Sequence, residues 1–156
     1  MKGFSLLELL LVLAILGIAL ALGLPRLNPD AQAVNQAARG LAEQVVRARL
    51  EAIRQNAPAG LQVFTEGAGG YVAFVDRNAN GAYDPGEEVQ TVRFGEGPWA
   101  RVRLAPERSA LGNLPLLFDP RGVPAKPITA TIALTDPPGR HLRKVVVSQA
   151  GRARLE

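Results

Sequence analysis

The sequence contains no cysteine, a single histidine and few aromatic residues, which make up 5% of its 156 positions. Without cysteine the chain can form no disulfide, iron–sulfur cluster or thiolate zinc site. His141 alone cannot build a multi-histidine metal site, so a surface imidazole is its simplest interpretation. The chain also shows no serine–histidine–aspartate set, catalytic carboxylate pair or glycine-rich phosphate loop. Nothing therefore predicts an enzyme and, apart from the calcium-type loop described below, no cofactor is expected.

What the sequence does have is a long apolar run near its start, from Phe4 to Leu24, in which only Ser5 and Glu8 are polar. A helix of this length reaches about 31 Å, close to the hydrocarbon thickness of a bilayer. Its apolar side chains favour insertion by about 6 kcal/mol in total, whereas one carboxylate costs about 3 kcal/mol. The run predicts a membrane-spanning helix. Since no small-residue cleavage site follows Leu24, we expect the run to stay in the mature protein.

Glu8 requires a partner, because an ionisable group inside a membrane segment is usually functional. Cleavage between Gly3 and Phe4 would create an α-amino group with a pKa near 8 at the new N-terminus. Within one helix this amine and Glu8 lie four residues apart, so a neighbouring copy shifted along the axis could supply the amine instead. The alternative is an uncleaved signal anchor that carries its acid by chance.

The residues around this site resemble the class III signal of type IV pilins and type II secretion pseudopilins: Lys2, Gly3, Phe4, Ser5, Leu6, Leu7 and Glu8, then the apolar run and Pro25. The resemblance implies that a prepilin peptidase cuts after Gly3 and methylates Phe4. It also implies that Glu8 pairs with a neighbouring subunit's N-terminus during filament assembly. Two features depart from the usual pattern, since Ser5 stands where threonine is commoner and the leader, residues 1–3, is very short.

The segment 25–56 predicts a linker followed by an amphipathic helix. Pro25 and Pro29 favour a break at residues 25–29, after which Asp30 is placed to cap a helix. Apolar residues then recur alternately every four and three positions, as on one face of a helix. This predicted stripe consists of Val34, Ala38, Leu41, Val45, Ala48 and Ala52.

Residues 57–156 predict a β-rich head, because short alternating apolar runs are separated by Gly, Pro and Asn clusters. The runs are Leu61–Thr65, Tyr71–Asp76, Val89–Phe94, Ala100–Leu104, Leu116–Asp119, Ile128–Thr135, Leu142–Ser148 and Arg152–Leu155. In Ile128–Thr135 the alternation predicts one buried face and one wetter face. The expected fold class is α+β, with a long N-terminal helix, membrane-spanning in its first half (4–24), packed on an antiparallel β-sheet head.

The head also resembles the GspH/FimT group of minor pseudopilins and pilins, in Tyr71–Gly81, Asp84–Glu88, Phe118–Gly122, Val145–Ser148 and Gly151–Arg154. This resemblance implies a type IV pilin fold and a minor subunit of a type IV filament. Its partners would be other major and minor pilins, a prepilin peptidase, an inner-membrane assembly platform and, before assembly, membrane lipid. The chain would cross the inner membrane once, with its head in the periplasm, before it enters a pilus or pseudopilus.

The segment Asp76–Glu87 fits a calcium-loop pattern, with oxygen donors at Asp76, Asn78, Asn80, Asp84 and Glu87 and a sharp turn at Gly81. The flanking segments are expected strands rather than helices. Clusters of Asn, Asp and Gly also form turns without an ion, through Asx hydrogen bonds. The loop is therefore either a weak calcium site or a hairpin turn.

The C-terminal segment 140–156 holds the whole net charge of +4. If 152–155 is extended, Arg152 and Arg154 point to the same side. In some family members from transformable bacteria a GRxR motif at this place binds DNA, and here it corresponds to Gly151, Arg152 and Arg154, with Arg143 and Lys144 nearby. Such binding would be phosphate-driven and weaken with salt. The alternative is a charged edge strand that prevents aggregation.

Two functions remain open for this minor filament subunit. One is a structural role in a type II secretion pseudopilus, in which the head helps to initiate or cap the filament. The other is binding of extracellular DNA during natural transformation, through the basic C-terminal segment.

Overall fold

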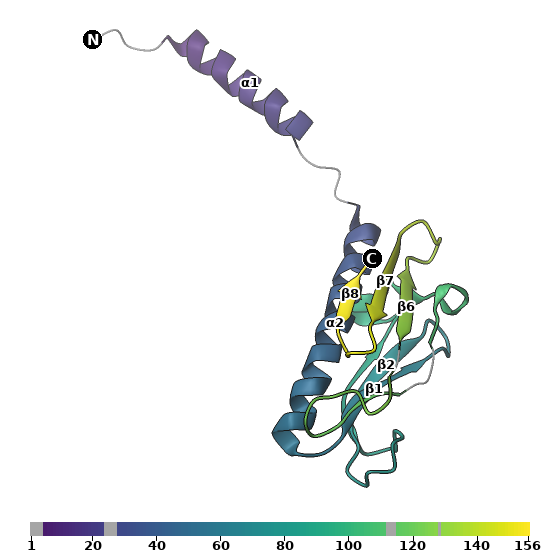
Figure 1. Cartoon of the computed structure of the whole chain (residues 1–156). Helices are drawn as coiled ribbons and strands as arrows, with labels where there is room; N and C mark the ends of the chain where they lie inside the picture. The colour runs from purple at the N-terminus through teal and green to yellow at the C-terminus, as the bar shows by residue number, and fades with distance from the viewer. Residues whose placement is uncertain (1–4, 24–27, 112–114, 128) are drawn as a thin grey trace.

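The computed structural model describes residues 5–23, 28–111, 115–127 and 129–156 (Figure 1). Two α-helices come first, α1 (Leu6–Gly23) and α2 (Pro29–Gln55). Eight strands follow: β1 (Ala59–Phe64), β2 (Gly70–Val75), β3 (Glu88–Arg93), β4 (Arg103–Leu104), β5 (Leu116–Phe118), β6 (Ala130–Thr135), β7 (Leu142–Val147) and β8 (Ala153–Leu155). Two short 3-10 helices, η1 (Gly97–Trp99) and η2 (Pro106–Arg108), flank β4.

Helix α1 is apolar around its whole circumference, and its side chains from Leu6 to Leu20 are exposed. It begins where the backbone oxygen of Ser5 accepts hydrogen bonds from the N–H groups of Glu8 and Leu9. Among the described residues, we find no helix with both the length and the apolar character needed to cross a membrane. The ends of the predicted span, Phe4 and Leu24, lie outside the described residues.

Helix α2 is capped by Asn28, whose Oδ1 accepts hydrogen bonds from the N–H groups of Asp30 and Ala31. The prediction that Asp30 caps the helix was wrong, because Pro29 fits the first helical position, where no N–H donor is needed. Asp30 instead forms an ion pair with Arg101 at 2.7 Å. The helix ends at Asn56 in the left-handed conformation. Within the predicted break, Asn28 is extended, and 25–27 lie outside the described residues.

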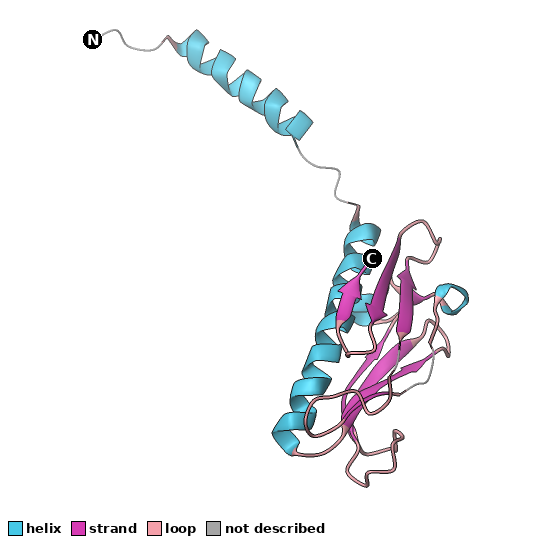
Figure 2. Ribbon diagram, viewed as in Figure 1, coloured by secondary structure: helices cyan, strands magenta, loops and turns pink. Residues whose placement is uncertain are grey.

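The head contains two four-stranded antiparallel sheets, in the orders β3-β2-β1-β5 and β4-β6-β7-β8. Figure 2 shows α2 running along the head, with the strands of both sheets packed beside it. Strands of each sheet contact α2: β1, β2 and β5 from the first, and β6, β7 and β8 from the second. The whole predicted stripe of α2 is buried in the core between helix and sheets, which confirms it.

Every predicted apolar run overlaps a strand, although β4 is much shorter than Ala100–Leu104 because residues 100 and 101 form the turn that follows η1. The prediction that only one face of β6 is buried was wrong at Ala133, which is fully buried. The segment after β4 covers it: the backbone N–H of Ala133 donates to Ser109 Oγ, and its oxygen accepts from the N–H of Ala105. Ile128, the start of that predicted run, lies outside the described residues.

Helix α2 offers a matched pair of substitutions that tests how the head is held together. Leu41 is 1% exposed and Val46 is 51% exposed on the same helix. Leu41→Ala should lower the free energy of unfolding by about 2–5 kcal/mol, because it leaves a cavity in the core. Val46→Ala should change it by less than about 1 kcal/mol. Urea unfolding of the full chain in detergent, followed by the fluorescence of Trp99, measures both, and equal losses would contradict the packing described here.

Candidate functional site

The predicted processing residues Gly3 and Phe4 lie outside the described residues, whereas Glu8 lies in the first turn of α1. Its side chain is exposed and accepts no hydrogen bond from any other described residue. The positive end of the helix dipole favours a carboxylate at this position. Glu8 therefore has no cationic partner among the described residues.

The surface around Glu8 is apolar on every described side of α1. The exposed large side chains are Leu6, Leu7, Leu9, Leu10, Leu11, Val12, Leu13, Ile15, Leu16, Ile18 and Leu20. A helix that is apolar all round requires apolar surroundings, which lipid or other helices can supply. Helix α2 differs, because its apolar stripe is already buried in its own head.

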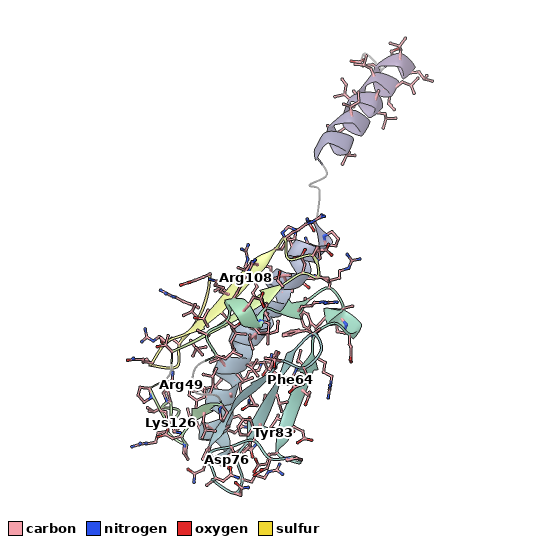
Figure 3. All side chains as sticks on the ribbon, turned by 90° about the vertical axis from the view of Figure 1, so that its right-hand side faces the viewer. Arg49, Phe64, Asp76, Tyr83, Arg108 and Lys126 are labelled. Atoms are coloured by element: carbon pink, nitrogen blue, oxygen red, sulfur yellow. The ribbon has the colours of Figure 1, made fainter. Side chains whose placement is uncertain are left out.

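The loop between β2 and β3 is the predicted calcium loop, and Figure 3 shows Asp76 and Tyr83 on it. Its two terminal acids are buried, Asp76 at 1% and Glu87 at 7% exposure. The Asp76 carboxylate accepts hydrogen bonds from the backbone N–H groups of Asn80 (3.1 Å) and Gly81 (2.7 Å). Glu87 accepts from those of Arg77 (2.9 Å) and Asp84 (3.2 Å). Backbone donors of the loop therefore satisfy both buried carboxylates.

The remaining predicted calcium ligands bond to one another. The side-chain amides of Asn78 and Asn80 both donate to Asp84 Oδ2, at 2.8 and 2.6 Å. In the described part of the chain, no three His, Asp or Glu side chains are grouped so that they could hold a metal ion. The loop is thus a hydrogen-bonded turn as it stands, and calcium binding stays a prediction.

The basic C-terminal residues divide between the two faces of the second sheet. In β7 and β8, Val147 pairs with Ala153 and Val146 with Arg154. Because side chains alternate along a strand, Arg154 lies on the face opposite the buried Val147, away from α2, and so does Lys144. Arg143 lies on the α2 side, where its Nε donates to Asn35 Oδ1 at 3.4 Å. The structure therefore separates Arg143 from Lys144 and Arg154.

Arg152 comes just before β8, where its backbone pairs with Ser148. This pairing continues the alternation and puts Arg152 on the same outward face as Arg154. Arg152 forms no ion pair with a described residue, whereas Arg154 Nη2 contacts Glu156 Oε1 at 3.1 Å. Lys144, Arg152 and Arg154 form what we call the outer basic face.

Gly151, the first residue of the predicted DNA-binding motif, is buried and has a φ of 72°. A Cβ atom there would lie 2.5 Å from Phe118 Cε1 and 3.0 Å from Pro124 Cγ. Only glycine combines this backbone conformation with such close packing. Gly151 therefore shapes the β7–β8 turn, and it is not placed to contact a ligand.

The sequence interpretation missed the role of His141, which is half-buried against the start of α2. Its Nε2 lies 2.9 Å from Nδ2 of Asn28, the residue that caps the helix. The backbone N–H of His141 donates to the buried Asp136. Burial acts to raise the pKa of Asp136, but backbone hydrogen bonds, chiefly from His141, outweigh it and lower that pKa. No local pattern indicates a contact between residues 28 and 141.

Comparison with known families gives two matches. Residues 37–151 match the family described as type II transport protein GspH. Residues 1–24 match the prokaryotic N-terminal methylation motif, which covers Gly3, Phe4 and Glu8.

Individual proteins agree with these matches. The chain is 70% identical to the pilin-like protein PilA1 of Thermus thermophilus, over 99% of this chain and 98% of that protein. The minor pilin FimU of Pseudomonas aeruginosa has a similar fold, with a TM-score of 0.51 and 23% identity over 78% of this chain and 91% of FimU. So does the minor pseudopilin EpsH of the Vibrio cholerae type 2 secretion system, with a TM-score of 0.54 and 14% identity over 79% of this chain and 95% of EpsH.

The observed architecture agrees with both family matches. An N-terminal helix joined to antiparallel sheets is the α+β fold of these minor pilins and pseudopilins. The methylation motif, residues 1–24, includes the apolar helix α1 and its single acid, Glu8. The chain therefore belongs to the GspH family and is a minor pilin or pseudopilin of a type IV system, a structural subunit and not an enzyme.

Proposed function

We propose that this chain enters a type IV filament through α1, after a prepilin peptidase has cleaved it behind Gly3 and methylated Phe4. The observation that supports this best is α1 itself, an exposed apolar helix with a single acid, Glu8, in its first turn. Before assembly, the segment Phe4–Leu24 crosses the inner membrane once and the head lies in the periplasm. The inner-membrane assembly platform then transfers the subunit to its neighbours in the filament.

Glu8 selects the position of the neighbouring subunit in this proposal. A carboxylate among apolar helices is costly unless a cation pairs with it. The α-amino group of Phe4 on an adjacent pilin, shifted along the filament axis, is such a cation. When a carboxylate and an amine meet in an apolar environment, each compensates the other's desolvation, so the pair favours one register between subunits over others.

A second candidate function, DNA binding, is supported by the outer basic face. Lys144, Arg152 and Arg154 share one side of β7 and β8, and the planar guanidinium of arginine suits phosphate. Two residues of the predicted set do not belong to it: Arg143 faces α2 and Gly151 is buried. This candidate corresponds to DNA uptake in natural transformation, whereas a purely structural role corresponds to a type II secretion pseudopilus.

For the loop Asp76–Glu87 we propose that its own hydrogen bonds hold it and that calcium contributes little. The support is that the carboxylates of Asp76, Asp84 and Glu87 all accept hydrogen bonds from within the loop. An ion would have to displace several of these bonds in order to bind.

The assembly proposal predicts that Glu8→Ala reduces incorporation into filaments by at least about tenfold, since an amine left unpaired among apolar helices costs about 3–5 kcal/mol. The level of the chain in the membrane should not change. Immunoblots of sheared filaments and of membranes measure both quantities. Ser5→Thr, a change on the same turn, is the control and should assemble normally. Wild-type incorporation of Glu8→Ala, or a mature chain that still begins at Met1, would refute the proposal.

The DNA proposal predicts that Arg152→Ala together with Arg154→Ala weakens binding to duplex DNA and lowers the slope of log K against log salt by about 2. Titrations of the full chain at two salt concentrations provide this slope. The double variant Arg49→Ala/Arg77→Ala removes the same charge elsewhere and should bind like wild type. Undiminished binding by the Arg152/Arg154 variant would exclude the outer basic face.

The loop proposal predicts that the melting temperature differs by less than about 1 °C between millimolar calcium and a chelator. Asp76→Ala should lower the free energy of unfolding by about 2–4 kcal/mol in both solutions, because two backbone N–H groups lose a charged acceptor. Thermal and urea unfolding, monitored by circular dichroism, provide these values. A rise of several degrees with calcium, absent in Asp76→Ala, would assign an ion to the loop instead.

A further inference from the structure

A cluster of basic residues surrounds the start of α2, at the end of the head nearest to α1 in the sequence. Arg140, His141 and Arg143 line a cavity of about 220 Å³ together with Ala31 and Val34 of α2. We call these three residues the proximal cluster. Figure 1 shows the turn between β6 and β7, which carries Arg140 and His141, beside the first turns of α2. Arg143 follows at the start of β7.

The proximal cluster carries positive charge that its nearest acids do not remove. Arg140 and Arg143 are exposed and form no ion pair with a described residue. Asp30, in the first turn of α2, is already paired with Arg101 at 2.7 Å. Asp136 is buried behind the turn and accepts a hydrogen bond from the backbone N–H of His141. Within the described chain, Arg143 donates only to neutral acceptors, Asn35 Oδ1 and the backbone oxygen of Leu142, so the positive charge of both guanidinium groups remains to attract an anion.

The chain length fixes where this charge lies relative to α1. Helix α1 ends at Gly23, and the cap of α2 is Asn28, which contacts His141 at 2.9 Å. Five residues span at most about 18 Å. The proximal cluster therefore cannot lie far from the end of α1. If Phe4–Leu24 is in the bilayer, as proposed above, the cluster is within reach of the lipid headgroups, which form a layer about 5–8 Å thick.

We propose that the proximal cluster binds the phosphates of anionic lipid headgroups while the subunit is in the membrane, before it is assembled into the filament. This inference rests on the proposed membrane location of Phe4–Leu24. Arginine suits phosphate because its planar fork donates two parallel hydrogen bonds. Each basic residue near an anionic surface favours the docked state by about fivefold, so two arginines favour it by roughly twentyfold. Docking of this strength orients the head against the membrane and remains reversible when the filament takes up the subunit.

The absence of cysteine permits a direct test, because Pro138→Cys in the exposed β6–β7 turn provides a single labelling site. The labelled full chain is placed in vesicles of phosphatidylcholine alone or with 30% phosphatidylglycerol, each carrying a headgroup quencher. The proposal predicts that the label is quenched at least about three times more strongly in the anionic vesicles than in those of phosphatidylcholine alone. This ratio is consistent with the roughly twentyfold preference for the docked state. Arg140→Ala together with Arg143→Ala should remove most of this difference.

The matched control is Arg49→Ala with Arg77→Ala, which removes the same charge far from the cluster. Arg49 lies twenty residues beyond Pro29 along α2, or about 30 Å. Figure 3 places Asp76, the neighbour of Arg77, at the end of the head remote from the start of α2. This control should show the same difference in quenching between the two kinds of vesicle as the wild type. If the control loses that difference, the net charge of the chain explains the quenching, and the assignment of a lipid site to the proximal cluster is wrong.

Three further outcomes separate the alternatives. If inorganic phosphate changes the label signal in phosphatidylcholine vesicles, and Arg140→Ala/Arg143→Ala abolishes that change, the site takes free phosphate and the lipid assignment is wrong. If the chain floats with both vesicles but is quenched equally, only the present inference fails. If it floats with neither, the proposed membrane location fails first, and the inference fails with it.

Discussion

Both sheets of the head pack against one helix, and the small side chains of α2 set how closely they approach. Ala37, Ala38, Ala48 and Ala52 are buried beside the larger Leu41 and Val45. Strands of both sheets contact this surface, although the sheets share no strand. Larger side chains at the alanine positions would force the backbones apart. The positions of the strands that contact α2, among them β2 before the Asp76 loop and β7 after His141, therefore depend on this packing.

The two helices differ in where their apolar side chains lie. Helix α2 confines them to one stripe and buries that stripe within its own chain, so the head needs no partner for its core. Helix α1 has them on every described side, and those between Leu6 and Leu20 are all exposed. Its apolar surface can be covered only from outside the chain, first by lipid and then by other subunits in the function proposed here. In that proposed function Glu8 sets the register, because a single acid on an apolar surface favours the one position in which it meets a cation.

The parts of the fold that could be predicted from the sequence are those that show in the local spacing of apolar residues. The stripe of α2 and the overlap of each predicted run with a strand follow from spacings of three to four and of two residues. Features that depend on pairing between distant segments could not be predicted. Strand β5 pairs with β1 and β4 pairs with β6, so the head contains two sheets where one was expected. The contact between Asn28 and His141 joins residues 113 positions apart. Gly151 fits a motif in the sequence, but its packing on Phe118 appears only in the fold.

The basic C-terminal segment shows why charge counted along a chain does not define a surface. Arg143 and Lys144 are adjacent in sequence, yet strand alternation sends them to opposite faces of the second sheet. Arg143 joins Arg140 near the start of α2, while Lys144 joins Arg152 and Arg154, one of which is already paired with Glu156. One charged segment thus supplies two separate basic surfaces, and phosphate binding is proposed for each. Because they face different directions, a subunit docked on a membrane through one surface would still present the other to DNA.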